Sequence, residues 1–208
     1  MSRIISLEGL NRSGKGTQIS LLKELLESHH LPVEVLRGDG SRPGNNSFGF
    51  YDPESDWWKE WQAKKNKSPE DWNSAYELLN AENDSRKSSF LDENIEGYII
   101  MDRSYISRYF MLRQQGINAS LNEIASSAAV VPEAHFYLNV PKNTLLERVS
   151  DDNPTKTEFR REIVIRWYDL WSEVIKTAKD FLKDAFKIVD GTQSPQIIHN
   201  YIASKALK

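Results

Sequence analysis

Residues 9–17, near the N-terminus, have the composition and spacing of a phosphate-binding loop, with Gly9, Gly14 and Lys15 at its characteristic positions. Glycine permits a tight backbone path on which several N–H groups converge on one phosphate, and a following helix N-terminus adds partial positive charge. Lys15 would add a full charge near the β- and γ-phosphates of ATP. We therefore expect ATP to contact Gly9, Asn11, Ser13, Gly14, Lys15, Gly16 and Thr17.

Two positions in this loop bear on phosphoryl transfer. Arg12 is a second cation, which would stabilise charge as it develops on the γ-phosphate, although a solvated surface arginine is a competing interpretation. Gly16 occupies the position at which Ser or Thr usually ligates Mg²⁺, and Thr17 follows one residue later. We expect Thr17 to take part in a Mg²⁺ site, and the direct protein ligand stays open.

A second group of chemically active residues follows an apolar run at 98–101, which ends in Asp102 and Arg103. Ligands of open α/β sheets bind beyond the carboxyl ends of the strands. Asp102 would therefore face a phosphate-bound Mg²⁺ through water, and Arg103 would meet the phosphate of an acceptor as a bidentate fork. A surface ion pair is the alternative, and a phosphate loop in the same chain makes it less favoured.

Composition bounds the setting in which these residues act. The chain has 208 residues, of which 39% are hydrophobic, and this suits one domain over 1–208. The formal net charge of −3 gives no sign of a nucleic-acid or membrane partner, and the lack of cysteine excludes disulfides and thiolate metal sites. The first apolar run is too short for a signal or membrane segment, so we expect a cytoplasmic protein.

The elements that would position these residues alternate between strands and helices. Short aliphatic or aromatic runs predict strands over 4–7, 33–36, 98–101, 135–140 and 187–189, with amphipathic helices between them. This alternation predicts an α/β fold with a parallel sheet and helices on both faces. Residues 38–53, rich in Gly, Pro, Asn and Ser, indicate a long functional loop, whereas 150–157 fit a mobile lid and a connector equally well.

Taken together, the motifs resemble those of thymidylate kinases and, more broadly, of nucleoside monophosphate kinases. The resemblance covers most of the chain and rests on residues 8–15, 102–107, 132–140, 145–148 and 189–194. It implies a P-loop three-layer fold with a five-stranded parallel sheet, an acceptor-binding region at about 38–96 and a short lid at about 149–161. It also implies ATP and Mg²⁺ as cofactors, a deoxynucleoside monophosphate as acceptor and a homodimer.

The resemblance implies roles for further residues. Arg148 would stack on adenine, which Gly191, Thr192 and Gln193 would border. Asp39 would be the acid near Mg²⁺. The cation for the acceptor phosphate would be Arg42 or Arg37. A basic residue in the phosphate loop, here Arg12, implies that the lid is not the main source of cations.

The chain also departs from the family pattern. Asn11 stands where the family usually has an aspartate that contacts the acceptor sugar, so sugar recognition is altered rather than lost. On the base-reading helix, Asn83 takes the place of an expected arginine, and Arg86 follows about one turn later. We expect both residues near the acceptor, and the identity of the base stays open.

Two other functions compete with a nucleoside monophosphate kinase. A deoxynucleoside kinase would need an acid that takes a hydroxyl proton, and Asp39 is the candidate. A regulatory protein that binds a nucleotide without turning it over is favoured weakly by Gly16 and Asn11. We expect the kinase, with Lys15, Arg12, Asp102 and Asp39 as its catalytic residues.

Overall fold

The computed structural model describes residues 3–37, 68, 70, 71, 74, 77, 84, 87–92, 96–149 and 154–207. Within this part of the chain, a single sheet is formed by strands β1 (Arg3–Glu8), β2 (Val33–Arg37), β3 (Tyr98–Asp102), β4 (Ala134–Asn139) and β5 (Phe186–Asp190). The strand order is β2-β3-β1-β4-β5 and every pair is parallel. The predicted five-stranded parallel sheet is confirmed, and β1 lies at its centre.

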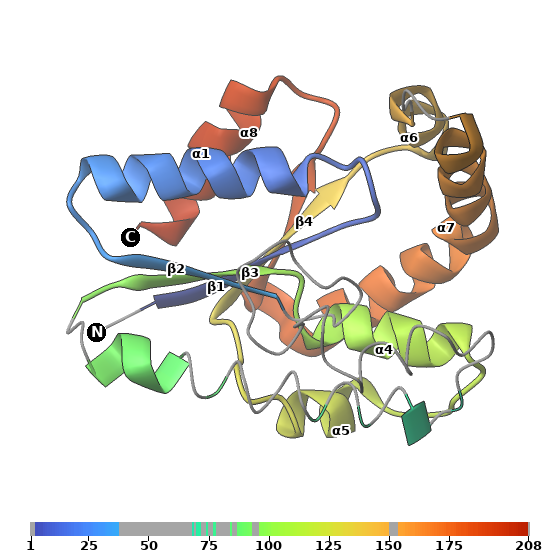
Figure 1. Ribbon diagram of the computed structural model, residues 1–208, viewed down its shortest axis with the longest axis horizontal. Coiled ribbons are helices and arrows are strands. Elements are labelled where there is room, and N and C mark those ends of the chain that lie inside the picture. The colour runs from blue at the N-terminus through green and yellow to red at the C-terminus, as the bar shows by residue number, and fades with distance from the viewer. Residues whose placement is uncertain are drawn as a thin grey trace.

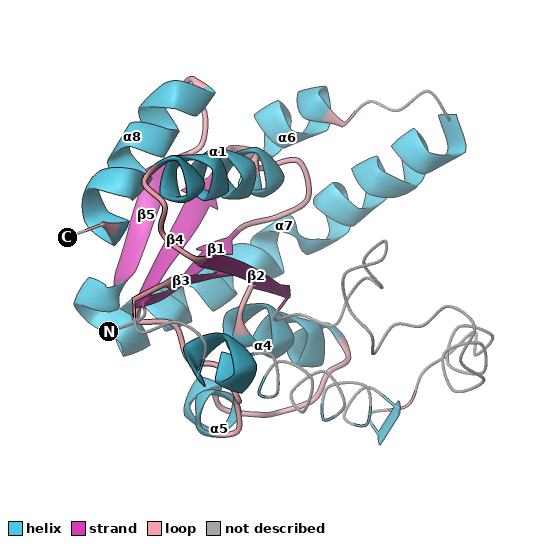
Figure 2. Cartoon of the chain, turned by 60° about the vertical axis from the view of Figure 1, so that its left-hand side comes forward, coloured by secondary structure: helices cyan, strands magenta, loops and turns pink. Residues whose placement is uncertain are grey.

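Helices cover both faces of this sheet, as Figures 1 and 2 show. On one face lie α1 (Lys15–Ser28) and α8 (Pro195–Ala206), and on the other lie α4 (Tyr105–Gln114), α5 (Leu121–Ser126) and α7 (Pro154–Leu182). The short α6 (Lys142–Arg148) precedes α7, and the 3-10 helix η2 (Lys183–Ala185) leads from α7 into β5. The three-layer α/β architecture expected from the alternating elements is confirmed.

The alternation of side chains along β1 explains how the sheet serves both layers. Ile5 and Leu7 are buried in the cluster formed with α1 and α8, because successive strand residues point to opposite faces. Ser6 and Glu8 therefore point to the α4 face, where both are fully buried. A polar pair on the buried face of a central strand is unusual, since polar groups cost free energy to desolvate.

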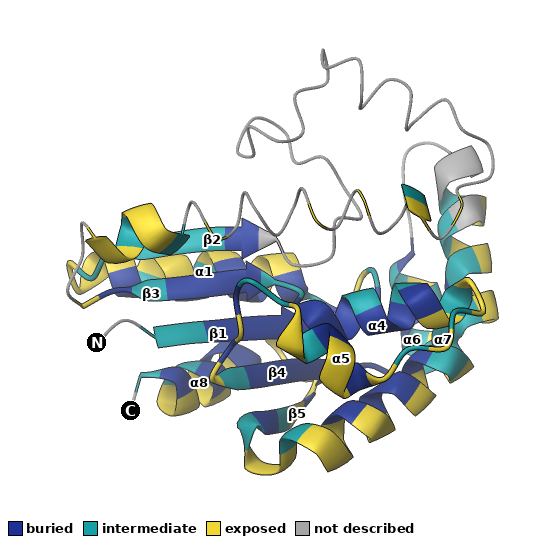
Figure 3. Cartoon of the chain, turned by 90° about the horizontal axis from the view of Figure 1, so that it is seen from below, coloured by how far each residue is buried: buried dark blue, intermediate teal, exposed yellow. Residues whose placement is uncertain are grey.

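The two ends of the chain meet beside the sheet. The Arg3 guanidinium donates to the carbonyl of Ala206 at 3.2 Å, and the Gln18 amide donates to the carbonyl of Pro195 at 3.0 Å. Apolar residues of α1 and α8 pack in one cluster on this face, and the outer sides of these helices are exposed (Figure 3). The last helix therefore completes the layer that supports α1.

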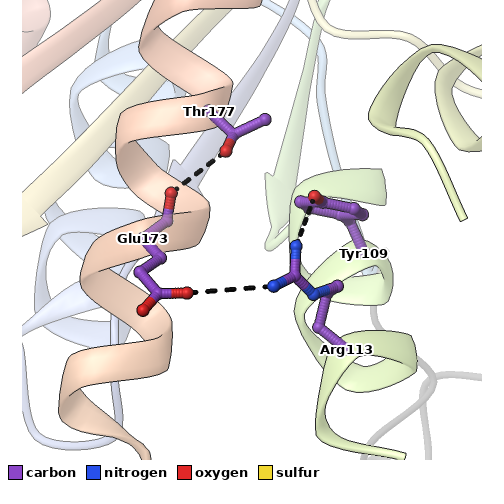
Figure 4. A network of polar contacts seen from close by, with 4 residues as sticks. All are labelled: Tyr109, Arg113, Glu173 and Thr177. Atoms are coloured by element: carbon purple, nitrogen blue, oxygen red, sulfur yellow. Dashed lines mark hydrogen bonds and ion pairs between the residues drawn. The ribbon is translucent and has the colours of Figure 1, made fainter. Parts of the chain in front are cut away.

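The long helix α7 is held to α4 by both apolar and polar contacts. Phe110 packs edge-on against the fully buried Trp171, with ring centroids 4.6 Å apart. The Arg113 guanidinium donates to the Tyr109 hydroxyl at 3.1 Å and lies 3.8 Å from the Glu173 carboxylate (Figure 4). Although α7 has 29 residues, neither it nor another helix in the described ranges is apolar enough over a sufficient length to cross a membrane.

Candidate nucleotide-binding site

The predicted phosphate loop joins β1 to α1 at the carboxyl edge of the sheet. Its path requires positive φ at Gly9 (145°), Arg12 (69°) and Gly14 (103°). Gly14 is the N-cap of α1 and provides no side-chain cap, so the first-turn amides of the helix keep no acceptor within the helix itself. A helix start of this kind presents donors and partial positive charge to an anion.

Lys15 is buried and turns back over the loop. Its ammonium group donates to the carbonyl of Gly9 at 2.8 Å and to the carbonyl of Leu10 at 3.0 Å. These bonds fix the charged group inside the loop rather than in solvent. The sequence predicted a lysine beside the phosphates, and the structure adds that this lysine also fixes the backbone path.

The glycines of the loop differ in what they tolerate. A Cβ atom on Gly9 would lie 2.6 Å from Ser13 Oγ and 3.2 Å from the carbonyl oxygen of Leu138, so this position has no room for a side chain. For Gly16, in the first turn of α1, no atom of the described residues outside its own helical turn lies within 4 Å of the corresponding position. Glycine is therefore a steric requirement at position 9 and not at position 16. Thr17, which follows, is exposed on the same turn.

Asp102 ends the neighbouring strand β3, and Arg103 follows it directly. Arg103 has a positive φ of 71° and donates from Nη2 to Asn11 Oδ1 at 3.1 Å. This bond connects the predicted acceptor-phosphate cation to the phosphate loop. Arg37 is the register partner of Asp102 on β2, so the backbone places it at the same edge of the sheet.

Among the buried oxygen atoms of this region that have no hydrogen-bond partner in the described residues are Ser13 Oγ in the loop and Asp102 Oδ1 at the end of β3. A buried polar atom without a partner costs free energy, so such atoms indicate where a polar ligand binds. A hydroxyl in a phosphate loop suits a phosphate oxygen, and a carboxylate oxygen at the end of a strand suits the water shell of Mg²⁺. The residues present therefore fit ATP and Mg²⁺.

Glu8, the last residue of β1, is fully buried directly before the loop. The Ser107 hydroxyl donates to its Oε2 atom at 3.0 Å, while Oε1 has no partner among the described residues. Burial raises the pKa of Glu8 to about 7, although hydrogen bonds from Ser104, Ser107 and Ser6 and the charge of Arg103 oppose that rise. The carboxyl group thus lies behind Arg103 in a poorly solvated position.

The loop after β5 forms the other predicted part of the site. Arg148 Nη2 donates to the carbonyl of Gly191 at 2.9 Å, so the predicted adenine-stacking arginine lies against the predicted base loop. A Cβ atom on Gly191 would lie 2.5 Å from Val140, which requires glycine at that position. Hydrogen bonds from Gln193 and Thr192 hold the pKa of Asp190 at about 2 and define the turn.

Several predicted residues lie outside the described part of the chain. They are Asp39, Arg42, Asn83 and Arg86, together with residues 150–153 of the predicted lid. At the other end of the lid, the Arg161 guanidinium donates to the carbonyl of Leu146 at 3.0 Å and joins α7 to α6. The roles of these residues stay predictions.

Comparison with known proteins agrees with this geometry. No protein-family model matches the chain. A probable thymidylate kinase from Archaeoglobus fulgidus is 31% identical over 148 residues, which are 70% of this chain and 68% of that protein. The chain belongs to the thymidylate kinase family. Thymidylate kinases from Thermosipho africanus and Fervidobacterium nodosum are each 27% identical, and the matches cover 91% and 95% of this chain and 90% and 95% of theirs.

Membership of the thymidylate kinase family confirms the predicted activity in general terms. The protein is an ATP-dependent, Mg²⁺-dependent phosphotransferase whose acceptor is a nucleoside monophosphate. The deoxynucleoside kinase and the non-catalytic regulatory protein are accordingly not favoured. The partner of Arg103 in this site is Asn11, an amide at the position where the family was expected to have a carboxylate.

Sequence reasoning assigned no role to Glu8 or Ser107. Glu8 appeared only as the first residue of the resemblance motif, and Ser107 as the last residue of another. The position of Glu8 could have been predicted from the alternation of side chains along β1. Leu7 points to one buried face of the sheet, so Glu8 must point to the opposite face, which is also buried. The contact itself depends on the pairing of β1 with β3, which the sequence did not predict.

Proposed function

We propose that this protein transfers the γ-phosphoryl group of ATP to thymidine monophosphate. The names of its relatives support the choice of acceptor. The observation that carries the assignment of the site is the hydrogen bond between Arg103 and Asn11, because it holds an arginine against the loop that would bind ATP. An arginine in that position suits the second phosphate-bearing substrate.

The proposed roles follow from charge and position. An oxygen of the acceptor phosphate attacks the γ-phosphorus, the bond from that phosphorus to the β–γ bridging oxygen breaks, and ADP leaves. Lys15 and Arg12 neutralise negative charge on the transferring group, while Arg103, with Arg37 or Arg42, orients the acceptor in line. The attacking phosphate is already anionic, so positioning and charge neutralisation suffice and no strong base is required.

The remaining proposed contacts concern the metal and the bases. Bound Mg²⁺ would neutralise charge on the β- and γ-phosphates. Asp102, together with Thr17 or Asp39, would hold the ion or its water shell. Arg148 and residues 191–193 would contact adenine. Asn83 and Arg86 would contact the acceptor base.

A panel of acceptors tests this proposal directly. ADP release would be measured with thymidine monophosphate, the monophosphates of the other common bases and thymidine itself. We expect thymidine monophosphate to give the highest kcat/KM. Turnover of thymidine alone, or ATP binding with no transfer to any monophosphate, would overturn the proposal.

The Lys15→Met variant tests the assignment of the phosphate loop. We expect it to fold and to lose transfer, because it removes the buried ammonium group that lies inside the loop. The matched control is Lys23→Met, which removes an exposed lysine from the same helix, where it lies 3.6 Å from Glu27. Thermal unfolding of both variants would separate lost chemistry from lost structure. Unchanged turnover in Lys15→Met would refute the role of Lys15.

A further inference from the structure

The buried carboxyl group of Glu8 lies between the phosphate loop and the start of α4. Glu8 is the last residue of β1, directly before Gly9, and none of its side chain is exposed. On the α4 side it meets the first turn of that helix, whose N-cap is Ser104. The partial positive charge of a helix N-terminus favours an anion there, but it does not replace the lost hydration of a carboxylate.

Ser107 links this carboxyl group to Arg103. The Ser107 hydroxyl donates to Glu8 Oε2 at 3.0 Å and accepts a longer contact, at 3.5 Å, from Arg103 Nη1. The other terminal nitrogen of Arg103 donates to Asn11 at 3.1 Å. The guanidinium is thus held on two sides, by the phosphate loop and by the hydroxyl that Glu8 engages.

The charge of Glu8 also acts on Arg103 directly. Arg103 is among the groups that favour the ionised form of Glu8, and an electrostatic interaction is mutual. The backbone of Arg103 is in the left-handed region, with φ of 71°. This conformation costs free energy, so contacts of the residue with its surroundings must stabilise it. A charge behind the guanidinium provides such stabilisation.

We propose that Glu8 is a positioning residue, whose carboxylate, through the Ser107 hydroxyl, holds the Arg103 guanidinium beside Asn11 in the orientation that receives the acceptor phosphate. The inference rests on the proposed function, in which Arg103 binds that phosphate. Glu8 itself touches neither substrate. Its effect should therefore appear in the use of the acceptor and not in the use of ATP.

The Glu8→Gln variant separates this role from a purely structural one. Glutamine keeps the volume and an acceptor for the Ser107 hydroxyl but removes the charge. We expect the KM for thymidine monophosphate to rise about five- to tenfold, while the KM for ATP changes less than about twofold. Ser107→Ala should have a similar effect, and the double variant should show less than the product of the two effects, because both act through Arg103.

Two further variants make the outcomes decisive. Ile124→Val, in the buried side of α5, controls for a mild loss of core stability and should leave both KM values unchanged. Arg103→Ala tests the proposed function itself. If Arg103→Ala raises the acceptor KM and Glu8→Gln does not, the role of Glu8 is wrong. If neither variant raises it, the assignment of Arg103 is wrong as well.

Discussion

The Arg103 guanidinium donates a hydrogen bond of 3.1 Å to the side-chain oxygen of Asn11, and this bond joins the end of β3 to the phosphate loop that follows β1. The two strands are direct neighbours in the sheet, so the bond connects two adjacent parts of the proposed site. It gives the loop a connection to the residue that is proposed to hold the second substrate.

Removing this connection should weaken binding of the acceptor. We expect Asn11→Ala to raise the KM for the acceptor about tenfold, since a hydrogen bond to a charged group contributes about 1.5 kcal/mol. Asn11→Asp keeps an acceptor oxygen and should retain a low KM. Steady-state kinetics with each substrate varied in turn would measure both. Asn122→Ala, on the exposed side of α5, is the matched control, and an increase confined to the KM for ATP would contradict the prediction.

Gly16 offers a test of how Mg²⁺ is held. Among the described residues, no atom outside its own helical turn lies within 4 Å of the position that a Cβ atom on Gly16 would take. Gly16→Ser should therefore fold without strain and place a hydroxyl at the usual ligand position. We expect half-maximal activity at a lower Mg²⁺ concentration. Serine also favours a helix over glycine by about 0.5 kcal/mol, so stability should rise slightly.

Gly16→Ala is the control for this experiment, since it adds the same Cβ atom without the hydroxyl. It should share the gain in stability and leave the Mg²⁺ dependence unchanged. If both variants shift the Mg²⁺ dependence equally, the hydroxyl is not responsible.

Arg12 is held in a left-handed backbone conformation, with φ of 69°, inside the loop. Glycine adopts this conformation without the penalty of about 1 kcal/mol that other residues incur. We therefore expect Arg12→Gly to unfold at the same or a higher urea concentration, while kcat falls about a hundredfold or more because a transition-state cation is lost. A marked fall in stability, or unchanged kcat, would contradict this.

Lys183→Gly provides the matched control for Arg12. Lys183 is exposed, has φ of 49° and lies in η2, away from the phosphate loop. The Lys183→Gly variant should be more stable than the wild type and should have the same kcat. If both variants gain stability and only Arg12→Gly loses kcat, the left-handed backbone at Arg12 lowers the stability of the fold in a residue that activity requires.

The buried carboxyl group of Glu8 should make stability depend on pH. Its pKa rises from the ordinary 4.5 to about 7 in the folded protein, so the unfolded chain releases this proton first as pH rises. Stability is therefore full below pH 4.5 and is lost as pH rises towards 7, by about 3 kcal/mol over that interval. Urea unfolding of the wild type and of Glu8→Gln at several pH values would measure this as a difference that grows with pH.

His135 should act in the opposite direction at lower pH. Burial lowers the pKa of His135 from the ordinary 6.5 to about 3, and the ring is hydrogen-bonded to Ser6 at 2.7 Å. The contribution of neutral His135 to stability is lost as pH falls below 6.5, because the unfolded chain binds a proton at this histidine and the folded chain does not. This effect is common to the wild type and to Glu8→Gln, so it cancels in the comparison.

The elements of the fold were predictable because their periodicity is strong. All five strands were expected within one or two residues of their observed ends, and so was an amphipathic helix between the first two strands. Its apolar residues Ile19, Leu22 and Leu26 are buried. The strand order was not predictable, because an apolar run indicates that a strand is buried but does not indicate which strand it pairs with.

Within the site, the sequence indicated which residues carry chemistry but not how they contact one another. Lys15 and Arg103 were expected at the phosphates, yet their bonds to the loop carbonyls and to Asn11 depend on side-chain directions. The polar group of Ser6, Glu8 and His135 was missed, because a polar residue within an apolar strand run looks exposed until both faces are known to be covered. Residues 38–67, with the expected Asp39 and Arg42, lie outside the described residues and stay predictions.

The bonds from Arg3 to Ala206 and from Gln18 to Pro195 have a consequence for biosynthesis. The ribosome releases α1 and the five strands before α8, so the part of the apolar cluster that α8 contributes, including Ile198 and Ile202, is added only after the sheet has been made. Until α8 is added, the cluster that contains Leu22 and Leu26 is covered by the sheet but lacks the apolar residues of this helix. A chain that ended shortly before α8 would therefore contain every phosphate-loop residue and still expose the apolar surface that α8 covers.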